Sequence, residues 1–524
     1  MRTNNVSRLL FLGSVFAAGG LGCGSDPPSP SPGSGGSSSG TGGAGAASSG
    51  GTGMIPGVGG TTTTGTGATG GVGTGGTGGI GSGGIGTTGG TGGITPGTGG
   101  AGTGGGATGG TGGGGEPVTC NISVTSSEVS SAIPTVGIIQ WSTDLAGLSG
   151  ATIEFGPDTS YGMAAPVDLN EAGYRTLLLG MKAQRDYHYR IVAQAGNQRC
   201  ESQDFTITTG ALANGLPNKT IDTPNPGALA GGFLVSGRWQ GGPAFILDAD
   251  GDYVWWYSAG EMGRARMSYD GKHMWIRNTN VQGGQSRVVR VTMDGLQEEV
   301  MGEFGNSHHD FAVLPDESVA FISHDGCDTI KLRTPDGNVR DIIDVQQAHG
   351  GTSMCHANSI HYDPADQTLT FSDLYQDAYV KVTLDGEVVW VLGGSTSDFS
   401  GDVNWNAQHG HHNLPNNHIL FFNNFTGGDG QGPSLVFELA LDLNNMTAQR
   451  VWEYDGGEFS NVMGDVQRLH NGNTLITYSQ AGVIHEVDAN KQPVQTIVFS
   501  GGGFGGGALG YAMKRTSLYG APPK

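Results

Sequence analysis

Short apolar runs alternate with polar positions and turn residues along the chain after residue 118. Between residues 118 and 210, the runs at 136–141, 151–156 and 187–193 place apolar side chains at about every second position. A period of two is typical of antiparallel strands with one buried face. The pattern predicts a small all-β sandwich over residues 118–210, in which no catalytic constellation is visible.

A repeated unit begins near residue 211 and continues to residue 524. In each copy an apolar strand runs into a tight turn that carries an aspartate; these are Asp250, Asp294, Asp336, Asp385, Asp442 and Asp488. The turns recur about every 40–60 residues, a step typical of the four-stranded blades of a β-propeller. The length of 211–524 accommodates six blades, so the sequence predicts an all-β protein with a six-bladed β-propeller there.

Histidines gather at equivalent points of these repeats. They lie in three polar segments, 307–310, 355–359 and 408–412, each just before a turn. A propeller brings one loop of every blade to the same end of its axis, so we expect the three segments to meet. Convergent imidazoles would form a reaction centre, in which Asp310 is expected to orient His309 or to cap a turn.

The first residues have the features of an export signal. Residues 1–22 carry two arginines and an apolar run, and they end in a sequence similar to a bacterial lipobox before Cys23. Cys23 is therefore the expected site of lipidation, with a plain secretory signal as the alternative. No later run offers the ~18 apolar residues of a membrane-spanning helix. We expect an exported lipoprotein of the periplasm or cell surface, held at the membrane only by its lipid anchor.

Residues 23–117 consist almost wholly of Gly, Thr, Ser and Ala. Such a segment buries too little apolar surface to offset its ordering entropy, which predicts a disordered linker. A flexible coil of this length spans on the order of 50 Å. A collagen-like structure is not favoured, because no strict three-residue glycine period with proline is present.

The net charge and the cysteine content limit which partners the protein can bind and in which compartment it folds. The formal net charge of -21 argues against nucleic acid as a partner, since phosphates require a basic surface. Four of the five cysteines remain for pairing if the first is lipidated, as in an oxidising compartment. Cys120 and Cys200 bracket the small domain, whereas Cys327 and Cys355 lie in the large one. These positions predict the disulfides Cys120–Cys200 and Cys327–Cys355.

Several motifs in the large domain resemble those of the bacterial arylsulfate sulfotransferase (arylsulfotransferase) family. They occur in the family's order at residues 356–359, 386–394, 408–409, 467–469 and 471–476. The resemblance implies a six-bladed propeller behind an N-terminal β-sandwich. It also implies transfer of sulfuryl groups from aryl sulfates to phenols, with no nucleotide sulfate donor and no cofactor.

The small domain has a resemblance of its own. Trp141 and residues 179–190 are similar to a fibronectin type III-like sandwich. This resemblance implies a spacer or docking module for residues 118–210.

Position by position, the resemblance to the sulfotransferases makes His409 the nucleophile, which would become a sulfohistidine. His356 and Asn358 would hold the sulfuryl oxygens, and His309 or its neighbour His308 would line the opposite wall. These residue types suit the chemistry, because a neutral imidazole nitrogen attacks sulfur and donors placed in advance stabilise negative oxygens.

Gln408 and His411 are the other expected substrate-binding residues. The sulfotransfer reaction itself needs no metal. His411 and His412 nevertheless leave open a transition-metal site completed by His356 or His309, since imidazole is a common zinc and copper ligand.

One position departs from the family. Leu374 stands within residues 371–377, where the family carries an arginine that would grip the sulfuryl group. Leucine cannot donate a hydrogen bond, so two functions from different classes remain. The chain is either a sulfotransferase-like enzyme or a non-catalytic binding propeller that engages a glycan or a protein.

Overall fold

The structure is a computed structural model that describes residues 120–239, 242–259, 262–280, 285–351, 354–425, 432–500 and 508–521. The predicted signal sequence, Cys23 and the predicted linker lie outside the described residues. Within these ranges the protein is all-β, with nearly all strand pairs antiparallel and α1 (Val345–Ala348) as the one α-helix. The same ranges contain no helix with the length and apolar character needed to cross a membrane.

Two sheets form the N-terminal part of the described chain. One contains β1 (Ile122–Val129), β2 (Gly137–Thr143) and β5 (Thr176–Leu178); the other contains β3 (Gly150–Gly156), β4 (Met163–Pro166), β6 (Asp186–Ala195), β7 (Gln198–Glu201) and β8 (Phe205–Thr208). Trp141 of the first sheet shares a buried core with Phe155 and Tyr189 of the second. The alternating apolar positions therefore face each other between the two sheets, as in a sandwich.

Six sheets follow, and the first three begin the repeated region. They contain β10 (Phe233–Gly237), β11 (Ala244–Leu247) and β12 (Tyr253–Tyr257) with β34 (Met513–Arg515); β13 (Met262–Met267), β14 (His273–Asn280), β15 (Gln285–Thr292) and β16 (Glu298–Met301); and β17 (Ser307–Val313), β18 (Val319–Asp325), β19 (Cys327–Arg333) and β20 (Val339–Asp344).

The other three sheets complete the region. They contain β21 (Ala357–Asp363), β22 (Thr368–Asp373), β23 (Ala378–Thr383) and β24 (Val388–Gly393); β26 (Gln408–Leu414), β27 (His418–Asn423), β28 (Leu435–Asp442) and β29 (Thr447–Asp455) with β25 (Ser400–Gly401); and β30 (Asp465–Arg468), β31 (Thr474–Tyr478), β32 (Val483–Val487) and β33 (Pro493–Ser500) with β9 (Asn218–Asp222).

The six aspartate turns of the sequence occupy the same place in each sheet. They join β11 to β12, β15 to β16, β19 to β20, β23 to β24, β28 to β29 and β32 to β33. Each turn thus connects the last two consecutive strands of its sheet. The repeat seen in the sequence therefore corresponds to one sheet per copy.

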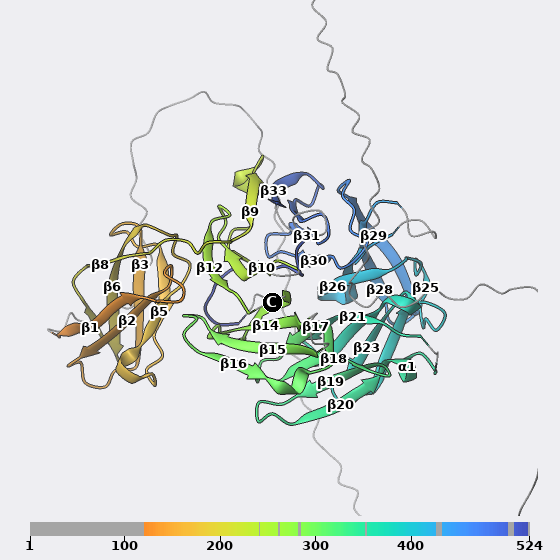
Figure 1. Cartoon of the computed structure of the whole chain (residues 1–524), viewed down its shortest axis with the longest axis horizontal. Coiled ribbons are helices and arrows are strands. Elements are labelled where there is room, and N and C mark those ends of the chain that lie inside the picture. Colours follow the sequence, from red (N-terminus) through yellow and green to blue (C-terminus); the bar gives the residue numbers. More distant parts are fainter. Residues whose placement is uncertain are drawn as a thin grey trace, which may run out of the picture. The chain divides into compact units, whose positions relative to one another are not determined.

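Neighbouring sheets contact each other in chain order, and the series returns to its start. Contacts run from β10 to β13, then to β17, β21, β26, β30 and β34. Because β34 pairs with β10, the last sheet reaches the first. Figure 1 shows β10, β17, β21, β26 and β30 around a common centre.

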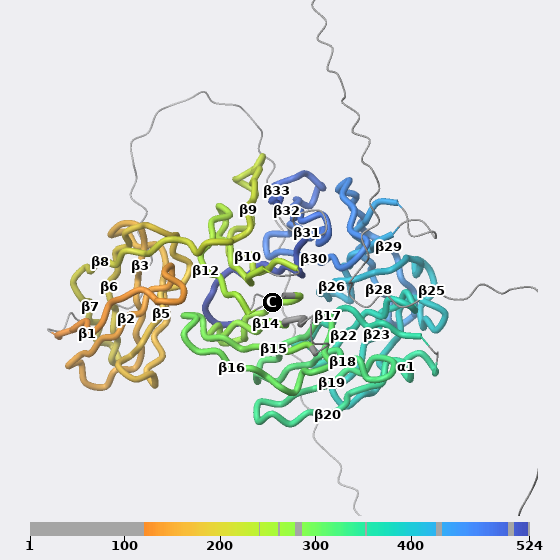
Figure 2. Tube along the Cα trace, in the orientation of Figure 1, coloured from red at the N-terminus to blue at the C-terminus, as the bar shows by residue number. Residues whose placement is uncertain are grey.

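Strands from both ends of this region complete the sheets. β9 lies beside β33 (Figure 2) and pairs with it as the outer strand of the last sheet. Ile221 lies opposite Ile497 in this pairing. β34 pairs with β10 in the first sheet, with Lys514 opposite Leu234. The first and last sheets are therefore held by pairings between distant parts of the chain.

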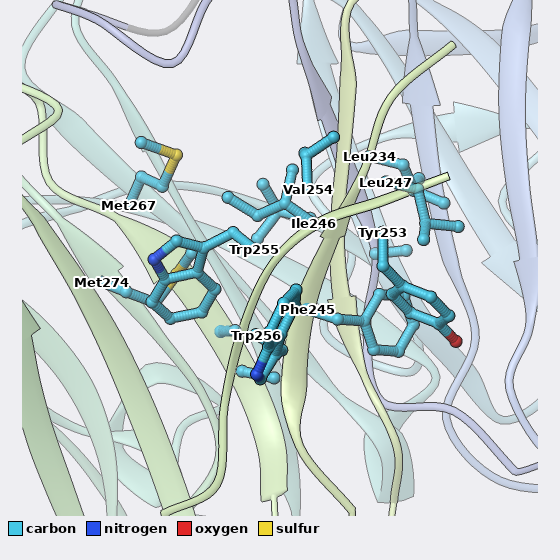
Figure 3. Close-up of a cluster of buried hydrophobic side chains, with 14 of the residues drawn as sticks. Leu234, Phe245, Ile246, Leu247, Tyr253, Val254, Trp255, Trp256, Met267 and Met274 are labelled. Atoms are coloured by element: carbon cyan, nitrogen blue, oxygen red, sulfur yellow. The ribbon is translucent and has the colours of Figure 1, made fainter. Parts of the chain in front are cut away.

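The core beside the first sheet is rich in large aromatic side chains. Phe245 of β11 and Trp255 of β12 lie in one buried cluster with Met274 of β14 (Figure 3). Ile484 and Ile497 of the last sheet belong to the same cluster. Burial of one such side chain contributes about 1.5–3 kcal/mol, so this core stabilises the junction between the first and last sheets.

Candidate functional site

Irregular pairing at the start of β17 brings two consecutive histidines together. In a regular strand His308 and His309 would point to opposite faces. The pairing of β17 with β18 shifts register between Ser307 and Phe311, and His309 has a positive φ of 51°. Similar shifts interrupt the first residues of β21 and β26. β-Bulges redirect side chains next to active sites. Here they occur at the starts of β17, β21 and β26, which are edge strands of three successive sheets.

Four imidazole rings lie together where these strands begin. The ring centroid of His309 lies 4.9 Å from that of His308 and 4.7 Å from that of His356. The His409 ring lies 6.2 Å from that of His309. His309 and His409 are buried, whereas His308 and His356 are partly exposed. The structure therefore brings the three histidine segments together, while the individual roles of these residues stay predictions.

Asn424 determines which nitrogen of His409 carries the proton. Its Nδ2 donates hydrogen bonds to the carbonyl oxygens of Ser460 and Met463, at 2.8 and 2.7 Å. These contacts identify Oδ1 as the atom that faces His409 Nδ1, at 2.8 Å. Since an amide oxygen only accepts, Nδ1 donates and Nε2 keeps its lone pair. Burial lowers the pKa of His409 from 6.5 to about 4, so the ring is neutral at neutral pH.

Gln408 anchors the backbone beside this histidine. Its Nε2 lies 3.0 Å from Ser372 Oγ and donates to the carbonyl oxygens of Asp373 and Ala378, at 2.9 and 3.0 Å. The Gln408 carbonyl accepts a 2.8 Å hydrogen bond from Asn358 Nδ2. The side chain of Gln408 thus holds the start of β26 on the preceding sheet, and its carbonyl orients Asn358.

Asp328 lies between two of the histidine segments. Its Oδ1 lies 3.0 Å from Nε2 of His308 and 2.9 Å from Nδ1 of His324, and its Oδ2 accepts from the Ala357 amide at 2.7 Å. Burial by itself would raise the pKa of Asp328, but hydrogen bonds from His308, His324 and Ala357 lower it below its usual value. The carboxylate is therefore ionised. Asp328 was not among the residues predicted for the site, although it directly follows Cys327.

Both expected disulfides are present. Cys327–Cys355 joins the residue before Asp328 to the residue before His356, and so it restrains one wall of the histidine cluster. Cys120–Cys200 lies in the N-terminal sandwich. Two disulfides are consistent with folding in an oxidising compartment.

Two arginines and two aspartates form a buried charged layer beside the histidines. Arg264 contacts Asp310 at 2.9 Å and Asp465 at 2.7 Å, and Arg266 contacts Asp310 at 3.2 Å. Burial would raise the pKa of Asp310, but the two arginines outweigh it and lower the pKa. The expectation that Asp310 orients His309 or caps a turn is wrong, since its carboxylate pairs with arginines of β13. The two arginines were missed; their spacing of two on a strand, which places both on one face, could have identified them.

Arg277 of β14 is a further buried cation that the sequence analysis missed. Its Nε donates a 3.1 Å hydrogen bond to the carbonyl of His309, which supports the positive-φ backbone there. Burial is the largest cause of a pKa of His309 well below 6.5, and the charges of neighbouring histidines and of Arg277 add to it. His309 is therefore neutral at neutral pH.

His411 and His412 belong to a second group of histidines. The His361 ring lies 5.9 Å from that of His411 and 5.4 Å from that of His412, and Ser359 Oγ lies 2.8 Å from His411 Nδ1. Burial lowers the pKa of His411 to about 3 and that of His412 to about 4. In the described part of the chain, neither belongs to a group of three metal-ligand atoms within 4.8 Å of one another. The metal site that the sequence left open at these two residues is thus not formed.

The backbone of Leu374 lies close to the histidine cluster. It begins the short 3₁₀ helix η4 (Leu374–Gln376), and its amide donates a 2.9 Å hydrogen bond to the carbonyl of His356. The next residue, Tyr375, is 39% exposed and has its ring 5.5 Å from that of His356. An aromatic side chain therefore borders the site on its solvent side.

Comparison with known proteins gives a family match over part of the repeated region. The arylsulfotransferase (ASST) family matches residues 339–502, a segment that contains His356, Asn358 and His409. The family resemblance inferred from the motifs is confirmed for this segment. No curated protein matches the chain.

Solved structures give only a distant likeness. TolB from Acinetobacter baumannii is 10% identical, with a TM-score of 0.40 and coverage of 64% of this chain and 80% of that chain. Virginiamycin B lyase from Staphylococcus aureus is 14% identical, with a TM-score of 0.35 and coverage of 53% and 88%. A protein of unknown function from Bacteroides caccae is also 14% identical, with a TM-score of 0.37 and coverage of 54% and 98%. These scores are too low to support an argument about function.

Proposed function

We propose that the protein is an arylsulfotransferase-like enzyme that carries a sulfuryl group on His409. The observation that carries the proposal is the contact between His409 and Asn424, which leaves Nε2 of a neutral imidazole with its lone pair. This nucleophile lies within the matched segment and beside three other imidazoles. A covalent histidine intermediate would account for transfer without a nucleotide sulfate donor.

The reaction would proceed in two displacements at sulfur. His409 Nε2 attacks the sulfur of the aryl sulfate, the bond from sulfur to the aryl oxygen breaks, and the phenolate leaves with the electron pair. A phenolic oxygen of an acceptor then attacks the sulfur, the sulfur–nitrogen bond breaks, and His409 regains its lone pair. Splitting the transfer in this way replaces one difficult step by two easier ones.

A proton must move in each displacement. Phenols have a pKa near 10, so protonation of the leaving oxygen lowers the barrier. His308 is the candidate donor, because it is partly exposed and its Nε2 faces the Asp328 carboxylate at 3.0 Å. In the second displacement the same group would take the proton of the acceptor phenol.

His356 and Asn358 are proposed to donate to the sulfuryl oxygens. Asn358 Nδ2 already donates one hydrogen to Gln408, which leaves its second hydrogen for an oxygen of the substrate. Removal of one such donor in an enzyme costs roughly 10²–10³ in kcat. Tyr375 would provide an aromatic surface for the aryl group.

Intact-mass analysis after exposure to a chromogenic aryl sulfate tests the proposal. The native protein should gain one sulfuryl group, and His409→Asn should gain none while keeping its melting temperature. His361→Asn is the matched control, because His361 lies in the second histidine group and has no part in the proposed chemistry. Equal labelling of His409→Asn and the native protein would exclude His409 as the nucleophile.

The alternative is a binding propeller that has lost the chemistry, and Leu374 favours it. Leu374→Arg separates the two functions. In a weakened enzyme, a restored charged hydrogen bond of roughly 1.5–3 kcal/mol should raise turnover about ten- to a hundredfold. In a binding propeller that has lost the chemistry, the arginine should bring no gain in turnover.

The architecture supports the same family. We infer that the six consecutive sheets are the blades of a six-bladed β-propeller over residues 211–524 and that residues 118–210 are a fibronectin type III-like sandwich. Residues 1–22 and Cys23 would make the protein an exported lipoprotein. Metabolic labelling with a fatty acid, lost in Cys23→Ser, tests the anchor.

A further inference from the structure

Three imidazole rings of the cluster have their nitrogens close to one another. Ligand nitrogens of His308, His309 and His356 all lie within 4.8 Å of one another. Nδ1 of His308 lies 2.7 Å from Nδ1 of His309, so a single proton separates these two nitrogens. Nitrogens on a tetrahedral zinc ion, at 2.0–2.1 Å from the metal, lie about 3.3 Å apart. Small ring rotations would therefore convert this contact into a pair of metal ligands.

The surroundings of His308 resemble those of a metal ligand. Its Nε2 faces Asp328 at 3.0 Å, and the side chain of Asp328 is fully buried. A carboxylate that accepts from one ring nitrogen directs the other nitrogen, with its lone pair, toward a metal. Asp328 also accepts from the amide of Ala357, the residue after His356. One carboxylate therefore positions two of the three histidine segments.

The backbone holds the three rings in place. His309 keeps a positive φ of 51°, a conformation that is uncommon for a residue other than glycine. Conformations of this kind persist where the surrounding structure imposes them, and they cluster at ligand sites. The Cys327–Cys355 disulfide fixes the chain next to His356. The cluster is therefore preorganised, which metal sites require.

The geometry points to a divalent transition-metal site formed by His308, His309 and His356, with Asp328 as the carboxylate behind His308. Three histidines leave a fourth position open, as in catalytic zinc sites. In this position the ion would attract a sulfuryl oxygen and supply the positive charge that Leu374 cannot. The ion would then take the place of His356 as the group that holds the sulfuryl oxygens and of His308 as the group that stabilises the leaving oxygen; those two roles apply to the metal-free protein. This role rests on the proposed sulfotransfer, whereas metal binding itself does not.

Metal binding is measured on the full-length protein, purified without a histidine tag and stripped with a chelator. Calorimetric titration with Zn²⁺ should show one site per chain, and Co²⁺ should give the intense visible absorption of a tetrahedral site. His356→Ala and His308→Ala should weaken binding at least a hundredfold, and Asp328→Asn about 10–100-fold. His470→Ala, at an exposed histidine outside the cluster, should bind like the native protein.

Melting curves show whether each variant is folded. If an alanine variant does not fold, His308→Gln or His356→Gln replaces it. Absence of Zn²⁺ and Co²⁺ binding to the native protein would overturn the site. Unchanged binding in His356→Ala or His308→Ala would do the same.

Labelling by an aryl sulfate separates the two proposals. Metal binding without any sulfuryl gain would keep the metal site and reject sulfotransfer. Equal labelling rates with and without Zn²⁺, in a protein that binds none, would reject the metal site and keep sulfotransfer. Faster labelling of the Zn²⁺-loaded protein is the result expected if both are right.

Discussion

His409 Nδ1 lies 2.8 Å from Asn424 Oδ1, and the amide nitrogen of Asn424 is committed to the carbonyl oxygens of Ser460 and Met463. The asparagine therefore cannot rotate to present its nitrogen to the ring without the loss of two hydrogen bonds. Burial keeps His409 neutral, and this contact places its proton on Nδ1, so Nε2 keeps the lone pair that a nucleophile requires.

Asn424→Ala should lower turnover of an aryl sulfate about 10- to 100-fold. The variant loses the hydrogen bond that selects the tautomer, and a buried hydrogen bond of this kind contributes roughly 1–3 kcal/mol. Asn424→Asp keeps an acceptor for His409, but its charge should stabilise the imidazolium and shift the acid limb of the pH–rate profile upward. Steady-state kinetics over pH checks both variants. A purely structural role would lower the melting temperature and leave the pH profile in place.

Stability should fall as the pH is lowered from 6.5 toward 4. The folded-state pKa is about 4 for His409 and His412 and about 3 for His411, below the unfolded value of 6.5. The unfolded chain thus binds more protons in this window, so stability is fully present above pH 6.5 and is lost as the pH falls. Each of these histidines should lower the free energy of unfolding by roughly 2 kcal/mol between pH 7 and pH 5.

Urea unfolding at pH 7 and pH 5 measures this loss. His411→Gln removes one of the titrating groups and should reduce the difference between the two pH values. Equal free energies of unfolding at both pH values would show that these histidines are not buried in neutral form.

The two disulfides should differ in their effect on activity. Cys327→Ser/Cys355→Ser opens a loop with a sequence separation of 28 and should cost about 3–4 kcal/mol of stability. It should also reduce aryl sulfate turnover, because the chain beside His356 loses its restraint. The matched variant Cys120→Ser/Cys200→Ser should destabilise the N-terminal sandwich and leave turnover unchanged. Equal turnover of both double variants would contradict a link between the Cys327–Cys355 disulfide and the site.

The buried pair of Lys514 and Glu486 should be essential for closing the ring of sheets. Their side chains are 6% and 1% exposed and lie 2.6 Å apart, and they join β34 to β32 of the last sheet. Lys514→Met leaves the carboxylate uncompensated and should cost about 3–5 kcal/mol. Adding Glu486→Gln removes the buried charge and should recover part of this loss.

An exposed pair provides the control for this experiment. Arg450 and Glu453 are 33% and 45% exposed, and the Arg450 guanidinium also lies 3.8 Å from the ring centroid of Phe437. Arg450→Ala should therefore cost about 1–2 kcal/mol. Chemical denaturation of the native protein and the three variants gives the four free energies of unfolding. If Lys514→Met lowers the free energy of unfolding as little as Arg450→Ala does, the pair of Lys514 and Glu486 is not essential for closing the ring of sheets.

Local patterns in the sequence were enough to predict the all-β class and the repeat. Apolar alternation and aspartate turns depend on residues close in the chain, and each turn occupies the same place in its sheet. The gathering of His309, His356 and His409 also followed from the repeat, since equivalent segments of equivalent sheets lie at the same end. The two disulfides followed from the number and spacing of the cysteines.

The chemistry of the site depended on contacts that no local pattern records. Arg264 reaches Asp465 across a sequence separation of 201. The tautomer of His409 is determined by Asn424, directly after the next strand, and by the two backbone carbonyls that bind the amide nitrogen of Asn424. The bulge at His309 placed two consecutive histidines in one cluster, against the alternation that their sequence predicts. Hydrogen bonds and ion pairs between distant segments exist only once the sheets have packed, so tertiary structure alone decided which groups are paired, buried and neutral.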